Sequence, residues 1–106
     1  MMKKILFIDT SNNTEIKVGL EIDGKKNELV LPLDKRKAQA VLPMIDELLK
    51  KQGLSLRDIG EIEVNPGPGS FIGVRVGVTI ANTLGFLLKI PINKKPIGEF
   101  VEPVYK

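Results

Sequence analysis

The stretch that decides the fold of this chain reads NPGPGSFIGVR, from Asn65 to Arg75. Gly67 and Gly69 can adopt positive φ, and the proline before each of them holds φ near about −65°, so the backbone turns sharply. Ser70 stands where a helix N-cap is expected. Such a turn gathers backbone N–H groups beside the positive end of a helix, an arrangement that binds anions. A tight strand-to-helix connection explains the same residues.

The segment that follows, 70–88, predicts a helix that is apolar on nearly every side. Small residues recur along it at four-residue spacing, at Gly73, Gly77, Ala81 and Gly85. A stripe of this kind lets another backbone approach closely. A helix that is apolar all round needs two burial surfaces. We expect its own sheet to provide one and a partner the other; the alternative is that the first helix and the sheet bury all of it.

Three strands are predicted before the loop. A continuous apolar run at 5–8 is typical of a central strand, and the alternation over 16–22 is typical of a half-buried one. A turn at Asp23-Gly24 separates this second strand from a third over 27–33. Short connections of this kind predict an antiparallel meander.

A helix and two further strands complete the pattern. The helix is expected over 37–52, with Gly53 as its C-cap, and Pro43 inside it predicts a kink or a late start. A fourth strand is expected over 59–64 and a short fifth strand over 89–92.

This order, βββαβαβ, predicts an α/β fold with a mixed five-stranded sheet of order 3-2-1-4-5 and two main helices on one face. The fourth strand returns through a helix and should therefore lie parallel to the first, with a right-handed crossover. The arrangement is that of a single ribonuclease-H-like lobe, as in actin-like ATPases. We expect the lobe to span residues 1–92 and residues 93–106 to form an extended C-terminal tail.

Length and composition exclude several classes of protein. The chain has 106 residues, which is the size of one domain, and 42% of them are hydrophobic. Its net charge of +3 and its five aromatic residues, four Phe and one Tyr, do not suggest a dedicated nucleic-acid reader. Cysteine and histidine are absent, which excludes a zinc module, a metalloprotease or a Ser-His-Asp hydrolase within this chain.

No targeting or membrane segment is expected. The apolar run near the N-terminus ends at Asp9 and is too short for the hydrophobic region of a signal peptide. The uncharged stretch 76–88 is too short to span a bilayer. We therefore expect a cytoplasmic protein that does not contact a membrane.

Three stretches, at 5–11, 41–49 and 67–77, together resemble the bacterial TsaB family, also called YeaZ. The first is also similar to the opening strand and phosphate loop of the actin-like kinase superfamily. The match extends over residues 4–92 in the family's order, and the string GPGSF-x-GVR is its most specific part. The resemblance implies a catalytically silent relative of TsaD, which makes threonylcarbamoyladenosine in tRNA from threonylcarbamoyl-adenylate.

The resemblance also implies partners. TsaB proteins bind TsaD through the two helices of the N-terminal lobe, and they self-associate through the same surface. We therefore expect an accessory subunit that docks on a TsaD-like protein or on a second copy, and that meets tRNA only indirectly. The residues expected at this interface are Leu42, Ile45, Leu49, Gly73, Val76, Gly77, Ile80, Ala81 and Leu84.

Three departures from the family pattern are visible. Family members run to roughly twice this length as two similar lobes, yet residues 102–105 resemble the family's closing strand. Ile72 stands where the family usually has threonine. TsaD holds a metal through two histidines on its first helix, and the nearest positions here, Lys37 and Val41, carry no such ligand. No metal is implied.

A second interpretation is a minimal ATP- or phosphate-binding enzyme of the actin-like superfamily. Its candidate anion site consists of Asp9, Ser11, Gly67, Gly69, Ser70 and Arg75. Because actin-like proteins bind ATP between two lobes, we expect no cofactor here, with ATP only within a complex. Asp9 alternatively accepts backbone N–H bonds in its turn, and Arg75 alternatively forms a surface salt bridge. A third interpretation is a small tRNA-binding adaptor that uses the scattered basic pairs.

Overall fold

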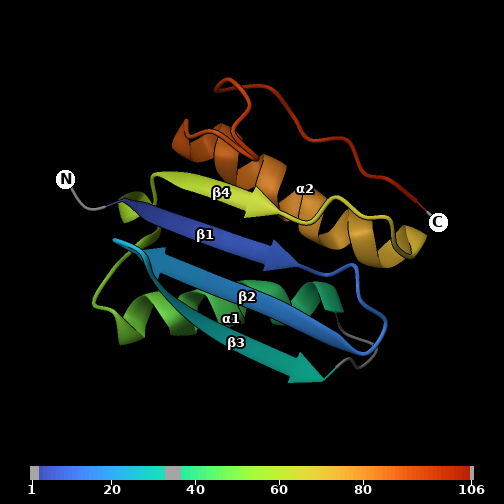
Figure 1. The fold of residues 1–106 in the computed structure, drawn as a ribbon, viewed down its shortest axis with the longest axis horizontal. Coiled ribbons are helices and arrows are strands. Elements are labelled where there is room, and N and C mark those ends of the chain that lie inside the picture. The colour runs from blue at the N-terminus through green and yellow to red at the C-terminus, as the bar shows by residue number, and fades with distance from the viewer. Residues whose placement is uncertain (1–2, 33–36, 106) are drawn as a thin grey trace.

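The computed structural model describes residues 3–32 and 37–105 as a layer of strands covered by two helices (Figure 1). The elements, in chain order, are β1 (Lys4–Asp9), β2 (Glu15–Ile22), β3 (Lys25–Pro32), α1 (Lys37–Lys51), the 3₁₀ turn η1 (Leu56–Asp58), β4 (Glu61–Val64) and α2 (Phe71–Leu88).

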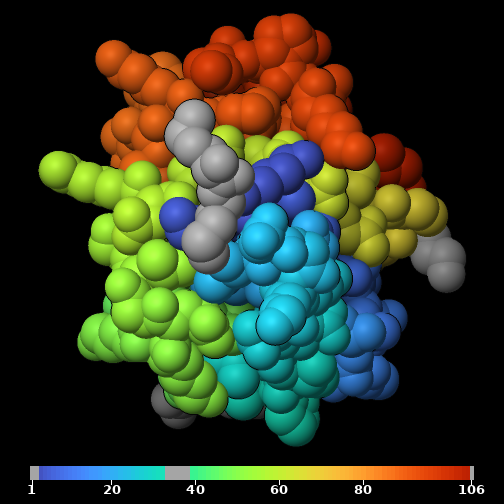
Figure 2. All heavy atoms as spheres, turned by 60° about the vertical axis from the view of Figure 1, so that its left-hand side comes forward, coloured from blue at the N-terminus to red at the C-terminus, as the bar shows by residue number. Residues whose placement is uncertain are grey.

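The sheet has the order β3-β2-β1-β4. β1 pairs antiparallel with β2 and parallel with β4, so the predicted meander and the parallel return are both confirmed. The two helices lie behind the sheet in Figure 1, on one of its faces. Seen from the end where β2 turns into β3, this hairpin lies beside the green residues around the end of α1, and the orange residues around the end of α2 lie at the opposite end of the view (Figure 2).

The predicted fifth strand is not formed, and the described residues contain four strands. In the segment 89–92, only Ile92 pairs with the sheet, through a single parallel bridge to Ile62. Pro91 precedes it and has no N–H group to donate, so a longer ladder cannot continue there. The five-stranded order is therefore corrected to four strands.

A side chain takes the place of the missing strand at the edge of β4. The carboxamide of Asn93 accepts a hydrogen bond from the Val64 N–H (2.8 Å) and donates one to the Val64 carbonyl (3.0 Å). This amide group therefore pairs with β4 as a backbone peptide unit would. The edge is closed by one bridge and one side chain.

The core lies between the sheet and the two helices. It contains the inward-facing apolar residues of β1 and β2, such as Leu6, Ile8 and Val18, and the apolar stripe of α1 around Val41 and Ile45. Burying this surface is the main favourable term in folding.

The helix α2 begins at the expected N-cap, since the Ser70 hydroxyl accepts a hydrogen bond from the Gly73 N–H (3.1 Å). It ends at Lys89, which has a left-handed conformation with φ of 56°. By length and composition α2 could cross a membrane, since its mean hydropathy is 1.7 over 18 residues. This differs from the prediction that its uncharged stretch, 76–88, is too short to span a bilayer. The core helix of a soluble protein passes the same test, and 39% of this window is buried inside the fold.

After α2 the chain turns and runs back along the helix towards its start (Figure 1). Residues 100–105 form this returning segment, which we name the strap. The Val104 N–H of the strap donates to the Pro66 carbonyl at 2.7 Å. Tyr105 forms a parallel bridge with Gly69. The tail was predicted as extended, and its last part lies against the loop before α2.

Candidate functional site

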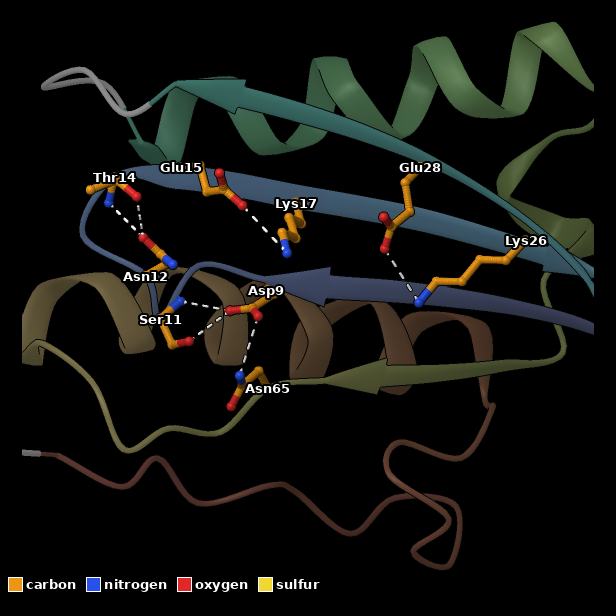
Figure 3. A network of polar contacts seen from close by, with 9 residues as sticks. All are labelled: Asp9, Ser11, Asn12, Thr14, Glu15, Lys17, Lys26, Glu28 and Asn65. Atoms are coloured by element: carbon orange, nitrogen blue, oxygen red, sulfur yellow. Dashed lines mark hydrogen bonds and ion pairs between the residues drawn. The ribbon is translucent and has the colours of Figure 1, made fainter.

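The turn after β1 and the loop before α2 lie side by side at one end of the sheet. Asp9 ends β1 and Asn65 follows β4, and these two strands are parallel neighbours. One oxygen of the Asp9 carboxylate accepts hydrogen bonds from the Ser11 N–H (3.0 Å) and hydroxyl (2.7 Å). The other accepts from the Asn65 side-chain amide at 3.2 Å (Figure 3). The chain itself therefore supplies three donors to this carboxylate.

These contacts change the acidity of Asp9. Burial on its own would raise the pKa of the carboxyl, but the hydrogen bonds from Ser11 and Asn65, with the charge of Lys17, outweigh it. The pKa of Asp9 therefore lies below its ordinary value, and the group is an anion at neutral pH. Its position favours the structural interpretation, in which Asp9 closes the turn after β1. Within the described ranges, no group of three or more acidic residues is placed to hold a metal.

The loop before α2 uses the N–H groups of Asn65 and Gly67 for hydrogen bonds within the chain. The Gly67 N–H donates to the Asn65 side-chain oxygen at 3.0 Å, and Ser70 caps the helix as described. Gly69 is buried, and a Cβ there would lie 2.8 Å from a Val74 methyl carbon and 2.9 Å from the Ser11 carbonyl oxygen. The structure thus brings Asp9, Ser11 and the glycine loop together, but an anion site here stays a prediction.

Arg75, the remaining member of the predicted anion site, is not part of this cluster. Its guanidinium carbon lies 4.8 Å from the centre of the Phe71 ring, one turn earlier on α2. The residue is exposed, and stacking on an aromatic ring is a common role of arginine.

Thr10 is the polar residue that sequence reasoning missed. Its side chain is fully buried, and its hydroxyl donates to the Gly73 carbonyl and accepts from the Gly77 N–H at 2.9 Å. A regular helix would join these two backbone groups to each other. The hydroxyl therefore reaches into α2 from the sheet. The signal available in the sequence was the pair of glycines four residues apart, which permits this close approach.

The stripe of small residues on α2 faces the chain's own fold. Gly73, Gly77, Ala81 and Gly85 are all buried. A Cβ on Gly77 would lie 2.6 Å from the Thr10 hydroxyl oxygen. The prediction that this stripe admits a partner is therefore corrected: Gly77 admits the end of β1 and Gly85 admits Ile92, both within the chain.

The other predicted interface residues divide by burial. Ile45, Leu49 and Leu84 are buried in the core. Leu42 on α1 is exposed, and Val76 and Ile80 on α2 are half-buried. The buried members support the helices from inside, whereas the others are accessible to a partner.

One apolar strip of α2 is only partly covered by the fold, since two of its three members are half-buried and pack against the core. It consists of Ile72, Val76 and Ile80, which recur at four-residue spacing and so lie on one line along the helix. Ile72 is 75% exposed. Together with Arg75 and Thr79 these residues line a hollow of about 330 Å³. We name Ile72, Val76 and Ile80 the outward face of α2.

Ile72 was not among the predicted interface residues. The signal that could have placed it there is its position four and eight residues before Val76 and Ile80, which were predicted at the interface, because residues at this spacing share one side of a helix.

A second apolar hollow, of about 510 Å³, lies beside α1. Leu42, Leu54 and Leu56 contribute to it, and the last two are half-buried. The helices thus present apolar surface beside α1 and on the outward face of α2, and Phe86 and Leu87 near the end of α2 are exposed as well.

Comparison with known proteins identifies a family to which this chain is similar. The model of the family described as TsaD, tRNA N6-adenosine threonylcarbamoyltransferase, matches residues 30–94, which is more than half of this chain.

Individual relatives match most of the chain. The tRNA threonylcarbamoyladenosine biosynthesis protein TsaB of Bacillus subtilis is 40% identical over 89 residues, covering 84% of this chain and 39% of that protein. The protein of the same name from Haemophilus influenzae is 38% identical over 88 residues, covering 83% of this chain and 37% of that protein. The chain thus spans about two fifths of the length of these relatives.

A solved structure is also similar. YeaZ from Pseudomonas aeruginosa superposes with a TM-score of 0.81 at 32% sequence identity, covering 86% of this chain and 42% of that one. The similarity therefore includes the arrangement of the sheet and of both helices.

Proposed function

This chain belongs to the family of TsaD, tRNA N6-adenosine threonylcarbamoyltransferase, and it is similar to TsaB as its sequence indicated; on that premise we propose that it is a non-catalytic subunit of the machinery that makes threonylcarbamoyladenosine in tRNA. Its role is to dock on a TsaD-like protein, or on a second copy of itself. It meets tRNA only through that partner, and it works in the cytoplasm.

The observation that carries this proposal is the outward face of α2. Its three residues are apolar, lie on one line of the helix and border a hollow, while the opposite side of the same helix is buried in the core. A line of apolar side chains that its own fold leaves partly open is the kind of surface that a partner helix covers. Leu42 and the hollow beside α1 offer further apolar contact area.

The residues around Asp9 support a non-catalytic role. The resemblance to TsaD implies histidine ligands for a metal, and this sequence contains no histidine. The Asp9 carboxylate accepts three hydrogen bonds within the chain and serves its own turn. We accordingly propose that the chain needs no cofactor of its own.

The fold proposal is a single ribonuclease-H-like lobe of the actin-like kind. It is supported by the sheet order β3-β2-β1-β4, by the parallel pairing of β1 with β4, and by the position of both helices on one face. The single bridge of Ile92 to Ile62 occurs where the fifth strand of such a lobe would add.

The test is the substitution Ile72→Glu, with binding to the TsaD of the same organism measured by surface plasmon resonance. Ile72 is mostly exposed and lies in the first turn of α2, where a negative charge is favourable, so the fold should be retained. A buried charge in a docked complex is costly. We expect the dissociation constant to rise by about a hundredfold or more, a loss of about 2.7 kcal/mol.

The matched control is Ile97→Glu, which makes the same change at an isoleucine that is 62% exposed and lies outside both helices. It should leave the dissociation constant unchanged within about twofold, since it is not on the docking surface. Equal binding by the Ile72→Glu chain and the unaltered chain would show that the outward face of α2 is not part of the interface. Failure of the unaltered chain to bind TsaD or itself would refute the proposal.

A further inference from the structure

The strap is fixed to α2 and its loop at both ends and in the middle. The Val101 N–H donates to the Asn82 side-chain oxygen (2.9 Å), and the Asn82 amide donates to the Val101 carbonyl (3.1 Å). The Val101 side chain is 4% exposed and belongs to the core. One buried side chain and a two-bond clamp therefore hold the strap against the helix.

The glycine loop is shaped to receive the strap. Gly67 has φ of 106°, and a Cβ at this position would overlap the Val104 carbonyl oxygen. Only glycine combines this backbone conformation with such a close approach. Together with the hydrogen bond from the Val104 N–H to Pro66, this contact seats the strap on the loop. The glycine that suggested anion binding thus accommodates the chain's own backbone.

At its far end the strap reaches the start of α2. The ring centres of Tyr105 and Phe71 lie 4.6 Å apart, and Arg75 lies over the same Phe71 ring. Arg75 in turn lines the hollow of the outward face with Ile72. A stack of three side chains therefore connects the strap to the residues of the docking surface. The strap leaves Ile72 itself exposed, so it does not cover that surface.

We propose that the strap is a positioning device for docking: by clamping Val101 on Asn82 and seating Tyr105 on Phe71, it holds the first turn of α2, with Ile72 and Arg75, in the arrangement that the partner recognises. This inference rests on the proposed function and attributes the control of docking to residues 100–105. Coupling between two sites is reciprocal. Partner binding must therefore favour the closed strap by the same factor by which the closed strap increases the affinity for the partner.

The strap can be followed in the full chain without a label. Tyr105 is the single tyrosine and the sequence has no tryptophan, so intrinsic fluorescence of the free chain reports this residue alone. The N–H groups of Val101 and Val104 are both bonded by the strap contacts, and their hydrogen exchange reports its closure. Dissociation constants for the TsaD of the same organism report docking.

Two variants release the strap from different sides. Asn82→Asp removes the donor to Val101 and places a carboxylate against its carbonyl, while Val101→Ser alters the strap and no residue of α2. Both should raise the acrylamide quenching of Tyr105, speed the exchange of the two amides by about tenfold or more, and raise the TsaD dissociation constant by about tenfold. Binding of TsaD to the unaltered chain should slow the same amides.

Asn93→Asp is the matched control, because Asn93 clamps Val64 at the sheet edge with the same pair of hydrogen bonds and so directs them to β4 and not to the strap. It should lower the melting temperature to a similar degree and leave the TsaD dissociation constant within about twofold. Released strap amides with unchanged docking would overturn the strap proposal and leave the docking proposal standing. Equal weakening by Asn93→Asp would also overturn it, and an unaltered chain that binds nothing overturns both.

Discussion

At the scale of single residues, polar side chains close the turns of this chain. Asp9 is an example: sequence reasoning placed it either at a phosphate or in its own turn, and the structure surrounds it with Ser11 and Asn65. The local part of this arrangement could be predicted, because an aspartate two residues before a serine commonly forms an Asx turn. The contact with Asn65 depends on β1 and β4 being neighbours, which no local pattern contains.

The lowered pKa of Asp9 predicts how stability depends on pH. Because the ionised form is favoured in the folded state, Asp9 contributes stability above the pH at which an unfolded aspartate titrates. That contribution is lost as the pH falls through the lower pKa of the folded chain. We expect the unaltered chain to lose more stability on acidification than Asp9→Asn, so that the two free energies of unfolding converge at low pH.

Urea unfolding at a series of pH values from 7 downwards measures this difference. Asp46→Asn is the control for losing one negative charge, since Asp46 is exposed on α1. Two stability curves that run parallel for the unaltered chain and Asp9→Asn would show that the carboxylate does not stabilise the turn.

At the scale of elements, the long helix is where sequence and structure agree most and also differ most. Its extent and the Ser70 cap were predicted, because a cap followed by a long apolar segment is a local signal. The direction of its glycine stripe was not, since a stripe of small residues fits a sheet and a partner equally well. The buried Thr10 hydroxyl decides between them.

The missing fifth strand has a similar cause. A short apolar segment with a proline satisfies the pattern of an edge strand, but strand formation also needs free hydrogen-bonding groups on the neighbour. Asn93 occupies those groups on Val64 with its side chain. A side chain that substitutes for a backbone peptide leaves no periodic signal in the sequence.

The substitution Gly77→Ala tests the assignment of the stripe. Alanine is the better helix former by about 1 kcal/mol, so a helix facing open space would gain stability. Here the new methyl group would lie 2.6 Å from the Thr10 hydroxyl oxygen and 3.3 Å from an Ile8 methyl carbon, both on β1 or directly after it. We therefore expect a loss of about 1–3 kcal/mol in the free energy of unfolding.

Gly60→Ala is the control for adding a methyl group elsewhere. The nearest atom to a Cβ there is the Lys4 carbonyl oxygen at 3.6 Å, an ordinary contact, and the change should stay within about 0.5 kcal/mol. A Gly77→Ala chain that is as stable as the unaltered chain, or more stable, would mean that α2 does not press on β1 as described.

At the scale of the whole molecule, the fold gives α2 three different environments. One side is buried against the sheet and α1, a second carries the strap, and the third is the outward face. The expectation that this helix has more apolar surface than its own fold can cover agrees with this division. The strap was not foreseen as a covering element, because its contacts with Asn82 and Gly67 join segments far apart in the sequence.

The outward face of α2 leads to a prediction about assembly. If self-association and docking on TsaD use the same residues of α2, the two complexes must exclude each other. Sedimentation velocity with fluorescently labelled chain should show a dimer that grows with concentration and disappears as unlabelled TsaD is added, leaving a complex with one copy of each protein. Ile72→Glu should weaken both complexes and Ile97→Glu neither. A stable species with two copies of this chain on one TsaD would show that the molecule has a second interface, and the apolar hollow beside α1 would be the surface to test next.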